Sequence, residues 1–255
     1  MRSRNTNEGW DDYLAAFHTE RTGITEAVLG AAPGDDGREP YDWLVQALPG
    51  DGVIVDVGCG SGPLAARTPR RWIGLDRNPA ELGRAARAAP GRVVRADAAA
   101  APVRAGGADV VICSMALMLF ADPTAAVGEM ARLLRVGGLF VALVPATRPL
   151  TIRDRVRYAR LLAALRLRRM PFRHPGVLDE PRSLLAPAGL DLVSMERRRF
   201  AYRLGDTDAA VLWMRSLYLP GLGGRRWHAV QQVAQRWTGS SIGLPLCRLV
   251  AVKPA

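Results

Sequence analysis

Between residues 53 and 145, short apolar runs alternate with segments of helical spacing. Five stretches have the character of buried strands or contain one, at residues 53–58, 71–76, 92–97, 109–120 and 139–145. Three segments between them predict helices, at residues 63–69, 78–90 and 122–138. This alternation is typical of a parallel sheet with helices on both faces, so the pattern predicts an α/β fold.

The segments on either side of this region do not continue the alternation of strands and helices. Ahead of the alternating region, three short helices are predicted at residues 10–18, 23–30 and 41–48. After it, the pattern predicts an Arg-rich helical segment at 148–175, a helix at 180–190, and strands at 191–204 and 246–252. The insertion at 205–243 contains Trp213, Trp227 and Trp237, which are either core residues or part of a substrate wall.

The stretch VIVDVGCGSGPLA at residues 53–65 joins the first predicted strand to the segment after it. Gly58, Gly60 and Gly62 follow the strand at a spacing of two, and glycine lets a backbone approach a ligand closely. Pro63 stands where a dinucleotide fingerprint would place its third glycine, and no lysine lies near enough for a phosphate loop. The loop therefore departs from both of these nucleotide-binding patterns.

Three aspartates accompany the glycine loop. Asp56 precedes it, while Asp76 and Asp97 end the second and third predicted strands. The carboxyl ends of parallel strands meet at one ligand crevice, and no basic residue is present there to hold a pyrophosphate. The set favours a nucleoside whose ribose hydroxyls bind Asp76, whose adenine amino group binds Asp97 and whose cationic tail is balanced by Asp56. Asp76 can also cap the next helix, and Asp97 can also stabilise a turn.

Five stretches, in order along residues 53–145, resemble the motifs of class I S-adenosylmethionine-dependent methyltransferases. They are VDVGCGSG, GLDRNP, RADAAAAPV, DVVICSMALMLFADP and LLRVGGLFVALVP. The resemblance is closest to the small-molecule enzymes of ubiquinone and menaquinone biosynthesis, although this chain has Arg135-Val136 rather than the usual proline before its paired glycines. It implies a seven-stranded Rossmann-like sheet, mostly parallel, with an antiparallel last strand and helices on both faces.

The resemblance also implies which residues hold S-adenosylmethionine. Those at the methionine part are Gly58, Cys59, Gly60 and Gly62, with Asp56 beside the cationic tail. Asp76 and Arg77 are expected at the ribose, and Asp97 and Ala98 at the adenine. Ser114 and Met115 are expected beneath the sulfonium. His18 lies on a segment that often covers the cofactor in such enzymes, so we expect it at the same site.

A single domain over residues 1–255 is expected, in four parts: an N-terminal helical lid at 1–48, a cofactor-binding core at 53–145 and substrate-cap insertions at 148–182 and 205–243. Within residues 151–174, two stripes of helical spacing occur. One should face the protein and comprises Ile152, Val156, Ala159 and Ala163; the other is basic and comprises Arg153, Arg157 and Arg160. The basic stripe is either a solvated face or a cap that attracts an acidic acceptor or a membrane surface.

Catalytic groups are less evident than cofactor groups. His228, beside Trp227, is the candidate general base. His18, His174 and His228 are dispersed, and no H-x-x-x-H or C-x-x-C spacing occurs, so the sequence predicts chemistry without a metal ion. A sulfonium is already activated, which leaves the protein to align the reactants and exclude water.

Composition adds limits to this interpretation. The formal charge is +11, but 34 of the 35 basic residues are arginine, a bias that fits a GC-rich genome better than a dedicated cationic surface. We therefore do not expect a nucleic-acid partner. The chain lacks a membrane-length apolar run and a signal-peptide core, and its three cysteines are too few for a disulfide framework, so a cytoplasmic location is expected.

The predicted function is in-line methyl transfer from S-adenosylmethionine to a small organic acceptor, acidic or apolar, in secondary or cofactor metabolism. Two alternatives remain. The first is an RNA methyltransferase, although CSMALMLF replaces the Asn/Asp-Pro-Pro-Tyr/Phe motif of amino-methylating enzymes of this fold. The second is a cyclase or binding protein that has this fold but transfers no methyl group. The oligomeric state is not determined by the sequence.

Overall fold

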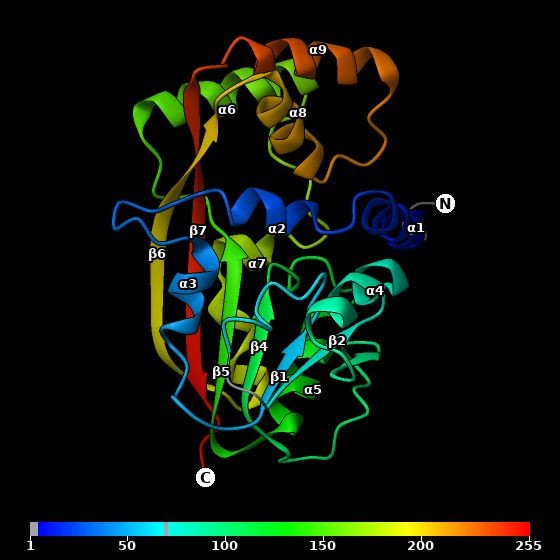
Figure 1. Ribbon diagram of the computed structural model, residues 1–255, viewed down its shortest axis with the longest axis vertical. Helices are drawn as coiled ribbons and strands as arrows, with labels where there is room; N and C mark the ends of the chain where they lie inside the picture. The colour runs from blue at the N-terminus through cyan, green and yellow to red at the C-terminus, as the bar shows by residue number, and fades with distance from the viewer. Residues whose placement is uncertain (1–4, 69–70) are drawn as a thin grey trace.

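A computed structural model describes residues 5–68 and 71–255. Its centre is a seven-stranded sheet with strand order β3-β2-β1-β4-β5-β7-β6 (Figure 1). The strands are β1 (Ile54–Val57), β2 (Trp72–Asp76), β3 (Val93–Arg95), β4 (Ala108–Ser114), β5 (Leu134–Pro145), β6 (Asp191–Leu204) and β7 (Ser240–Val252). Strands β1 to β5 pair in parallel, and β7 is antiparallel to both β5 and β6. The predicted Rossmann-like sheet with an antiparallel last strand is confirmed.

Both faces of the central strands are buried, as their continuous apolar sequences require. In β1, Val55 and Val57 pack into one core cluster and Ile54 packs into the other. In β4, Val111 and Cys113 join the first cluster while Val110 and Ile112 join the second, because successive side chains of a strand point to opposite faces. The sheet is thereby fixed with the carboxyl ends of its parallel strands at one edge.

Helices surround this sheet (Figure 1). They are α1 (Asn5–Glu20), α2 (Ile24–Leu29), α3 (Pro40–Val45), α4 (Pro79–Ala88), α5 (Pro123–Leu133), α6 (Ile152–Leu165), α7 (Gly176–Asp179), α8 (Thr207–Ser216) and α9 (Gly224–Gln235), with two 3₁₀ turns at Pro181–Leu184 and Ala186–Ala188. Asn78 caps α4 and Asp122 caps α5, each through its side-chain oxygen.

Three predicted elements differ from the structure. The helix expected at 63–69 is absent from its described residues, which form turns that include Ala65 N–H to Gly62 O (3.1 Å) and Arg67 N–H to Leu64 O (3.0 Å). Each of these bonds spans three residues, so the segment forms successive tight turns and no α-helix. The paired glycines Gly137 and Gly138 lie inside β5 instead of ending α5. The helix expected at 180–190 is two 3₁₀ turns.

Strands β6 and β7 continue past β5 as a two-stranded ribbon, and α6, α8 and α9 pack together at that end of the molecule (Figure 1). Asp154 anchors α6 to the ribbon: it accepts bonds from Arg199 Nε (2.7 Å) on β6 and from the backbone N–H of Gly243 (2.8 Å) on β7. Burial raises the pKa of Asp154, but its bonds from Arg199, Thr151 and Gly243 outweigh this effect, and the pKa lies well below the ordinary value.

The orientation of α6 corrects the prediction for its apolar stripe. The helix buries Asp154, Leu161 and Leu165. The stripe expected to face the protein is exposed instead, at Ile152, Val156, Ala159 and Ala163. Two apolar stripes are available on this helix, and the bond network of Asp154 determines which of them faces the protein.

Candidate cofactor site

A cavity of about 580 Å³ lies at the carboxyl ends of β1, β2 and β4. The order of strands reverses between β1 and β4, the position where open α/β sheets bind ligands. The cavity collects nearly all of the predicted cofactor residues: Asp56, Gly58, Cys59, Gly60, Asp76, Arg77, Asp97, Ala98, Ser114, Met115 and His18. Its volume lies within the usual range for small-molecule sites, about 300–1,000 Å³.

The glycine loop presents bare backbone to this cavity. Gly58, Gly60 and Gly62 all have positive φ, the conformation that glycine adopts without strain. A Cβ added to Gly60 would meet no atom within 4 Å, so this glycine borders open space. A Cβ added to Gly62 would lie 3.0 Å from the Cβ of Ala85, so this glycine lets the loop pack against α4. Gly62 accordingly does not line the cavity, whereas Gly60 does.

Asp76, at the end of β2, is bonded to the loop. Its Oδ2 accepts from the backbone N–H of Gly60 (2.9 Å) and its Oδ1 from that of Asn78 (2.8 Å). Burial raises the pKa of Asp76, and these two backbone bonds oppose the rise. A carboxylate oxygen has two acceptor sites, so each oxygen can accept one further bond from a ligand hydroxyl.

Asp56 is more deeply buried, with 1% of its surface exposed. Its Oδ2 accepts from Trp72 Nε1 (3.2 Å), while Oδ1 has no partner among the described residues. Burial raises the pKa of Asp56 to about 7, and the nearby charge of Asp76 contributes to the rise. A buried carboxyl with a free oxygen is a position that a cationic ligand would stabilise.

The end of β4 supplies the floor of the cavity. Ser114 Oγ is buried and has no bonding partner among the described residues. Met115, which follows it, has φ of 58°, a strained value for a residue with a side chain. Strained backbone and an unsatisfied buried hydroxyl are both typical of positions that contact a ligand.

The residues after β3 form another part of the wall. Asp97 is exposed, and its Oδ1 accepts from the backbone N–H of Ala99 (2.8 Å). The side chain therefore does stabilise a turn, as its sequence also allowed, and Oδ2 faces no donor among the residues described. Asp97 and Ala98 both line the cavity.

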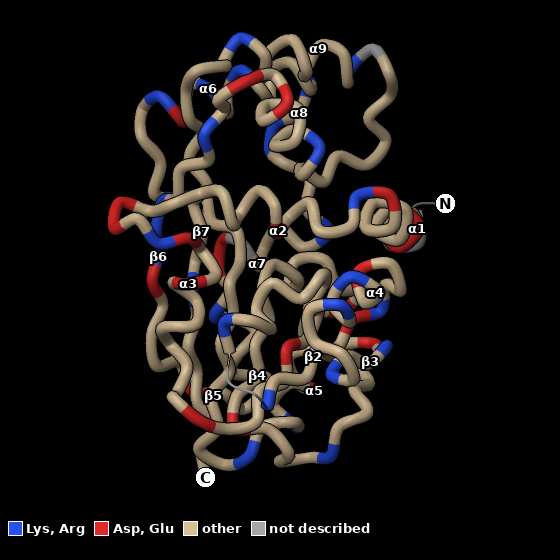
Figure 2. The backbone as a smooth tube through the Cα atoms, in the orientation of Figure 1, with Lys and Arg blue, Asp and Glu red and all other residues tan. Residues whose placement is uncertain are grey.

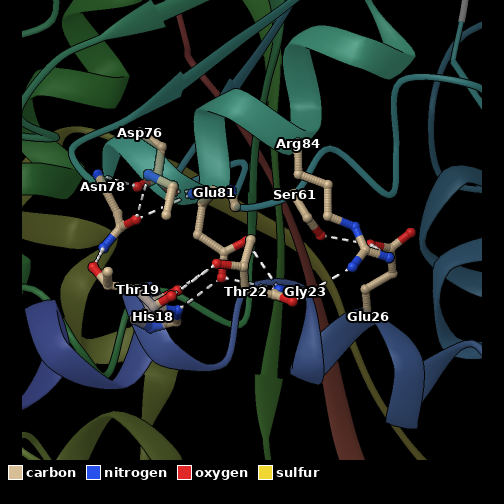
Figure 3. Close-up of polar contacts among 12 residues, drawn as sticks. His18, Thr19, Thr22, Gly23, Glu26, Ser61, Asp76, Asn78, Glu81 and Arg84 are labelled. Carbon is tan, nitrogen blue, oxygen red and sulfur yellow. Dashed lines mark hydrogen bonds and ion pairs between the residues drawn. The ribbon is translucent and has the colours of Figure 1, made fainter.

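Helix α1 covers one side of the cavity and is fastened to α4 by polar contacts (Figure 3). Asn78 Nδ2 donates to Ala15 O (3.4 Å) and to Thr19 Oγ1 (3.3 Å). Arg77 pairs with Asp11 (2.8 Å), and Asp11 also pairs with Arg173 (2.9 Å), whose bonding lowers the pKa of the Asp11 carboxyl. The guanidinium of Arg77 is therefore held at the edge of α1.

His18 connects two walls of the cavity. Its Nδ1 lies 3.1 Å from Oε1 of Glu81 on α4 (Figure 3), and its Nε2 lies 3.4 Å from the hydroxyl of Tyr218. Glu81 is also held by the backbone N–H of Gly23, at 3.2 Å to Oε2. Burial raises the pKa of Tyr218, so its phenol is protonated at neutral pH. Both ring nitrogens of His18 thus have a polar partner inside the site.

Tyr218, Glu81 and Asn78 are site residues that the sequence analysis missed. Asn78 has a sequence signal, since an asparagine before Pro79 at a helix start is a typical cap. Glu81 lies in the first turn of α4, where an acidic residue favours the helix and carries no functional signal of its own. Tyr218 lies 200 residues from His18, and no local pattern connects them.

His228, the predicted base, is not at this site. It lies on α9 with an exposed side chain and does not line the cavity. Helix α9 places Val230 and Ala234 in the core, and helical geometry turns His228 to the solvent side. Trp213 and Trp237, by contrast, are buried against each other beneath α8 and α9 with ring centroids 6.1 Å apart, so these two are core residues.

Comparison with known proteins agrees with this geometry. Residues 55–142 match a family model described as a methyltransferase domain. The matched segment includes the glycine loop and most of the cavity residues from β1 to β4. This part of the chain is a class I methyltransferase domain. S-adenosylmethionine is the methyl donor of such domains.

Two relatives match the methyltransferase domain over limited lengths. An uncharacterized methyltransferase of Mycobacterium sp. (strain JLS) is 38% identical over 101 residues, which are 38% of this chain and 40% of the relative. The mouse tRNA (carboxymethyluridine(34)-5-O)-methyltransferase ALKBH8 is 35% identical over 99 residues, 37% of this chain and 15% of that protein. The chain thus spans two-fifths or less of the length of these curated relatives.

A solved structure matches more of the chain at lower identity. The [4+2]-cyclase SpnF has a TM-score of 0.60 and 19% sequence identity, with 95% of each chain covered. The likeness extends to the flanking elements and concerns the fold alone.

The residues of the cavity fit S-adenosylmethionine. Gly60 leaves open space beside the loop, and Asp76 keeps acceptor capacity for two hydroxyls. Two buried polar atoms without partners, Asp56 Oδ1 and Ser114 Oγ, belong to residues that line the same space. Acidic and hydroxyl groups around a bare backbone loop suit a cationic nucleoside.

Among the described residues, no helix combines the length and apolar character needed to cross a membrane.

Proposed function

We propose that this chain transfers the methyl group of S-adenosylmethionine to a small organic acceptor of secondary or cofactor metabolism, by in-line displacement and without a metal ion. One observation carries the proposal: a single cavity is lined both by the glycine loop with Asp76 and by His18 with Tyr218. Residues that can bind a nucleoside and a histidine that can accept a proton therefore line the same cavity.

We assign the residues that line the cavity to the parts of the cofactor that the family resemblance implies for them. Asp76 and Arg77 bind the ribose, and Asp97 and Ala98 the adenine. The methionine part lies along Gly58, Cys59 and Gly60, with Asp56 near its positive charge. Ser114 and Met115 lie beneath the sulfonium. Gly62 shapes the loop by its packing against Ala85 and does not contact the ligand.

When bound, the cofactor supplies an electrophilic methyl group on a sulfonium. The chain's own tasks are to align the acceptor and to exclude water. Helix α1 covers the cavity through the contacts of Asn78 with Ala15 and Thr19. The segment after α8 closes it further, because the backbone N–H of Leu219 donates to the hydroxyl of Tyr13 on α1 (2.7 Å).

We assign the role of general base to His18, in place of His228. An O–H or N–H acceptor must lose a proton as the methyl group arrives, and neutral imidazole can take it. Glu81, 3.1 Å from Nδ1, orients the ring and stabilises the imidazolium that forms. Nε2, next to the Tyr218 hydroxyl, is the atom that accepts the proton. The acceptor is thus a small molecule with an ionisable O–H or N–H group.

Methyl transfer can be tested with cofactor labelled in its methyl group. The full chain is incubated with a small-molecule metabolite extract, with total RNA, and with each of these plus EDTA. We expect label in a small molecule, with or without EDTA. Label in RNA alone would support the RNA alternative, which the partial match to ALKBH8 motivates. Tight cofactor binding with no labelled product in either mixture would favour the non-methylating alternative.

Replacement of Asp76 by Ala is expected to weaken S-adenosylmethionine and its demethylated product to a similar degree. Loss of hydrogen bonds to a charged group costs about 1.5–3 kcal/mol, or roughly 10- to 150-fold in affinity. Calorimetry measures both ligands, with Asp191→Ala as a control because Asp191 is exposed on β6. Unchanged affinity in the Asp76 variant, or tighter binding of NAD by the wild type, would refute the assignment.

Cofactor affinity should rise with pH because of Asp56. Its pKa is about 7 in the folded chain, so near neutrality a cation binds more tightly after the proton leaves. We expect S-adenosylmethionine to bind more tightly as pH rises from about 5 to 8, with less than tenfold change per pH unit. Asp56→Asn should remove this dependence.

The carboxyl group of Asp56 also affects the stability of the ligand-free chain, which should fall as pH rises, whereas cofactor affinity should increase. Because burial raises the pKa of Asp56 from its ordinary value near 4 to about 7, the contribution of Asp56 to stability is complete below about pH 4 and is lost as pH rises through 7. Ligand-free Asp56→Asn should therefore melt at a higher temperature than the wild type at alkaline pH. If the cofactor affinity of Asp56→Asn changed with pH as that of the wild type does, the binding prediction would be wrong. If the melting temperatures of the two proteins changed with pH in parallel, the stability prediction would be wrong.

A cytoplasmic location remains part of the proposal. Cys59, Cys113 and Cys247 are free and buried, which is compatible with a reducing compartment.

A further inference from the structure

The outer face of α6 carries an exposed apolar stripe. Ile152 is 73% exposed and Val156 is 44% exposed, and Ala159 and Ala163 are exposed on the following turns. At about 100° per residue, these four positions fall within an arc of roughly 60°. The stripe lies opposite Leu161 and Leu165, which are buried against the rest of the chain.

Exposed arginines flank this stripe on both sides. Arg153 and Arg160 lie roughly 70–90° from its centre in one direction, and Arg155 lies about 70° from it in the other. All three side chains are exposed. The helix therefore presents a narrow apolar line between two basic borders.

A groove of about 380 Å³ runs beside the stripe, between α6 and the junction of α9 with β7. Four arginines line it, together with the two large stripe residues: Arg153, Arg157, Arg160, Arg236, Ile152 and Val156. Arg157 donates to the carbonyl of Ser241. In the part of the chain that the structure describes, no acidic side chain forms an ion pair with Arg153, Arg160 or Arg236. The positive charge of the groove is thus uncompensated.

We propose that this surface, the α6 face (Ile152, Arg153, Arg155, Val156, Ala159, Arg160, Ala163 and Arg236), docks onto an anionic lipid bilayer. The arginines contact lipid phosphates, and Ile152 and Val156 enter the boundary between headgroups and acyl chains. A helix lying in the membrane plane needs an apolar line with cationic residues beside it, whose long stems can reach up to the phosphates.

The position of the face suits a flat partner. Helices α6, α8 and α9 form one end of the molecule (Figure 1), and basic residues follow α6 and surround α9 there (Figure 2). The central apolar stripe distinguishes the surface from a nucleic-acid site, where phosphate contacts are polar throughout. The face is already exposed, so docking requires no rearrangement of α6.

Vesicle flotation tests the proposal without relying on turnover, so its outcome is separate from that of the proposed function. The full chain should float with vesicles of phosphatidylcholine and phosphatidylserine but not with phosphatidylcholine alone. Replacing Arg153, Arg155 and Arg160 with Gln should lower the partition coefficient on the order of a hundredfold at low salt. The matched control replaces Arg87, Arg92 and Arg104 with Gln, because these exposed arginines lie in other elements and their loss changes the net charge equally.

The apolar stripe has its own variant. Ile152→Ser with Val156→Ser should lower vesicle binding by about tenfold for each apolar side chain that leaves the interface, or on the order of a hundredfold together. The control is Val136→Ser with Val193→Ser, which removes exposed valines on β5 and β6. Since all four positions are exposed, folding should be retained, and circular dichroism checks this.

Three results would overturn the proposal. One is equal vesicle binding by the Arg153/Arg155/Arg160 variant and its charge-matched control. Another is vesicle binding that is unaffected by the two serine substitutions on α6. The third is that neither wild type nor variant binds vesicles, while the wild type binds RNA or inorganic phosphate and the α6 arginine variant does not. This result would assign the groove to a soluble anion.

Discussion

Replacement of His18 by Gln is expected to lower kcat by about 100- to 10,000-fold, the usual contribution of a general base. Glutamine is close in size to histidine but cannot take the acceptor's proton. Affinity for the demethylated cofactor should change little, because the glycine loop and Asp76 are untouched. The measurement is steady-state kinetics with the labelled acceptor, together with calorimetry of the variant.

Two measurements beside kcat separate a catalytic role for His18 from a structural one. A catalytic role lowers kcat while the affinity for the demethylated cofactor and the melting temperature stay close to those of the wild type, whereas a structural role changes all three. His228→Gln is the matched control, since His228 is exposed on α9 and outside the cavity. If His18→Gln retained full kcat, or if His228→Gln showed the larger loss, the base would have to be sought elsewhere.

Tyr218→Phe and Glu81→Gln test the partners of His18. Tyr218→Phe removes the hydroxyl that lies 3.4 Å from Nε2, and Glu81→Gln keeps an acceptor oxygen but removes the negative charge that lies 3.1 Å from Nδ1. We expect smaller losses of kcat than for His18→Gln, because these residues position the base and do not replace it. A loss in either variant as large as that in His18→Gln would move the catalytic role to that residue.

Replacement of Asp154 by Ala is expected to destabilise the chain by about 3–5 kcal/mol, because Arg199 and the N–H of Gly243 lose their partner inside the protein. The Asp154 side chain is only 1% exposed, while that of Arg199 is 21% exposed, so the acidic side of this ion pair is buried and the basic side is partly exposed. Chemical denaturation at neutral pH measures the change. Glu180→Ala is the control: it removes the exposed pair with Arg182 and should cost about 0.5 kcal/mol.

The contribution of Asp154 should also depend on pH. The bonds that Asp154 accepts hold its pKa below the ordinary value of an aspartate, so its contribution to stability is present above about pH 4 and is lost as the pH falls. The acid side of the stability curve should therefore be flatter in Asp154→Ala than in the wild type. A variant as stable as the wild type at neutral pH would show that the other contacts of α6, including Leu161, Leu165 and the bond from Arg157 to Ser241, suffice to hold it.

Much of the cofactor site could be predicted because its determinants are local. A buried strand, closely spaced glycines and an aspartate at each strand end specify their own geometry through side-chain periodicity and positive φ. The structure places Asp56, Asp76 and Asp97 around one cavity, as expected from the common edge of parallel strands. Their contacts with a cofactor remain predictions.

The acid-base group could not be found in the same way. His18, Glu81 and Tyr218 lie on α1, α4 and the segment after α8, and His18 and Tyr218 are 200 residues apart. Each residue alone resembles an ordinary helix or core position. The choice of His228 relied on its neighbour Trp227 in the sequence, which gave no information about which way α9 would turn.

The sequence by itself determined the alternating sheet, the glycine loop and the three strand-end acids, because these follow from contacts within a few residues. The tertiary structure alone decided which histidine reaches the cavity and which side of α6 faces solvent. Helix α6 has two apolar stripes, and the bonds of Asp154 to Arg199 and Gly243 select one of them for burial. Partners this distant in the chain meet only when the β6–β7 ribbon has formed, so no local pattern could encode the outcome.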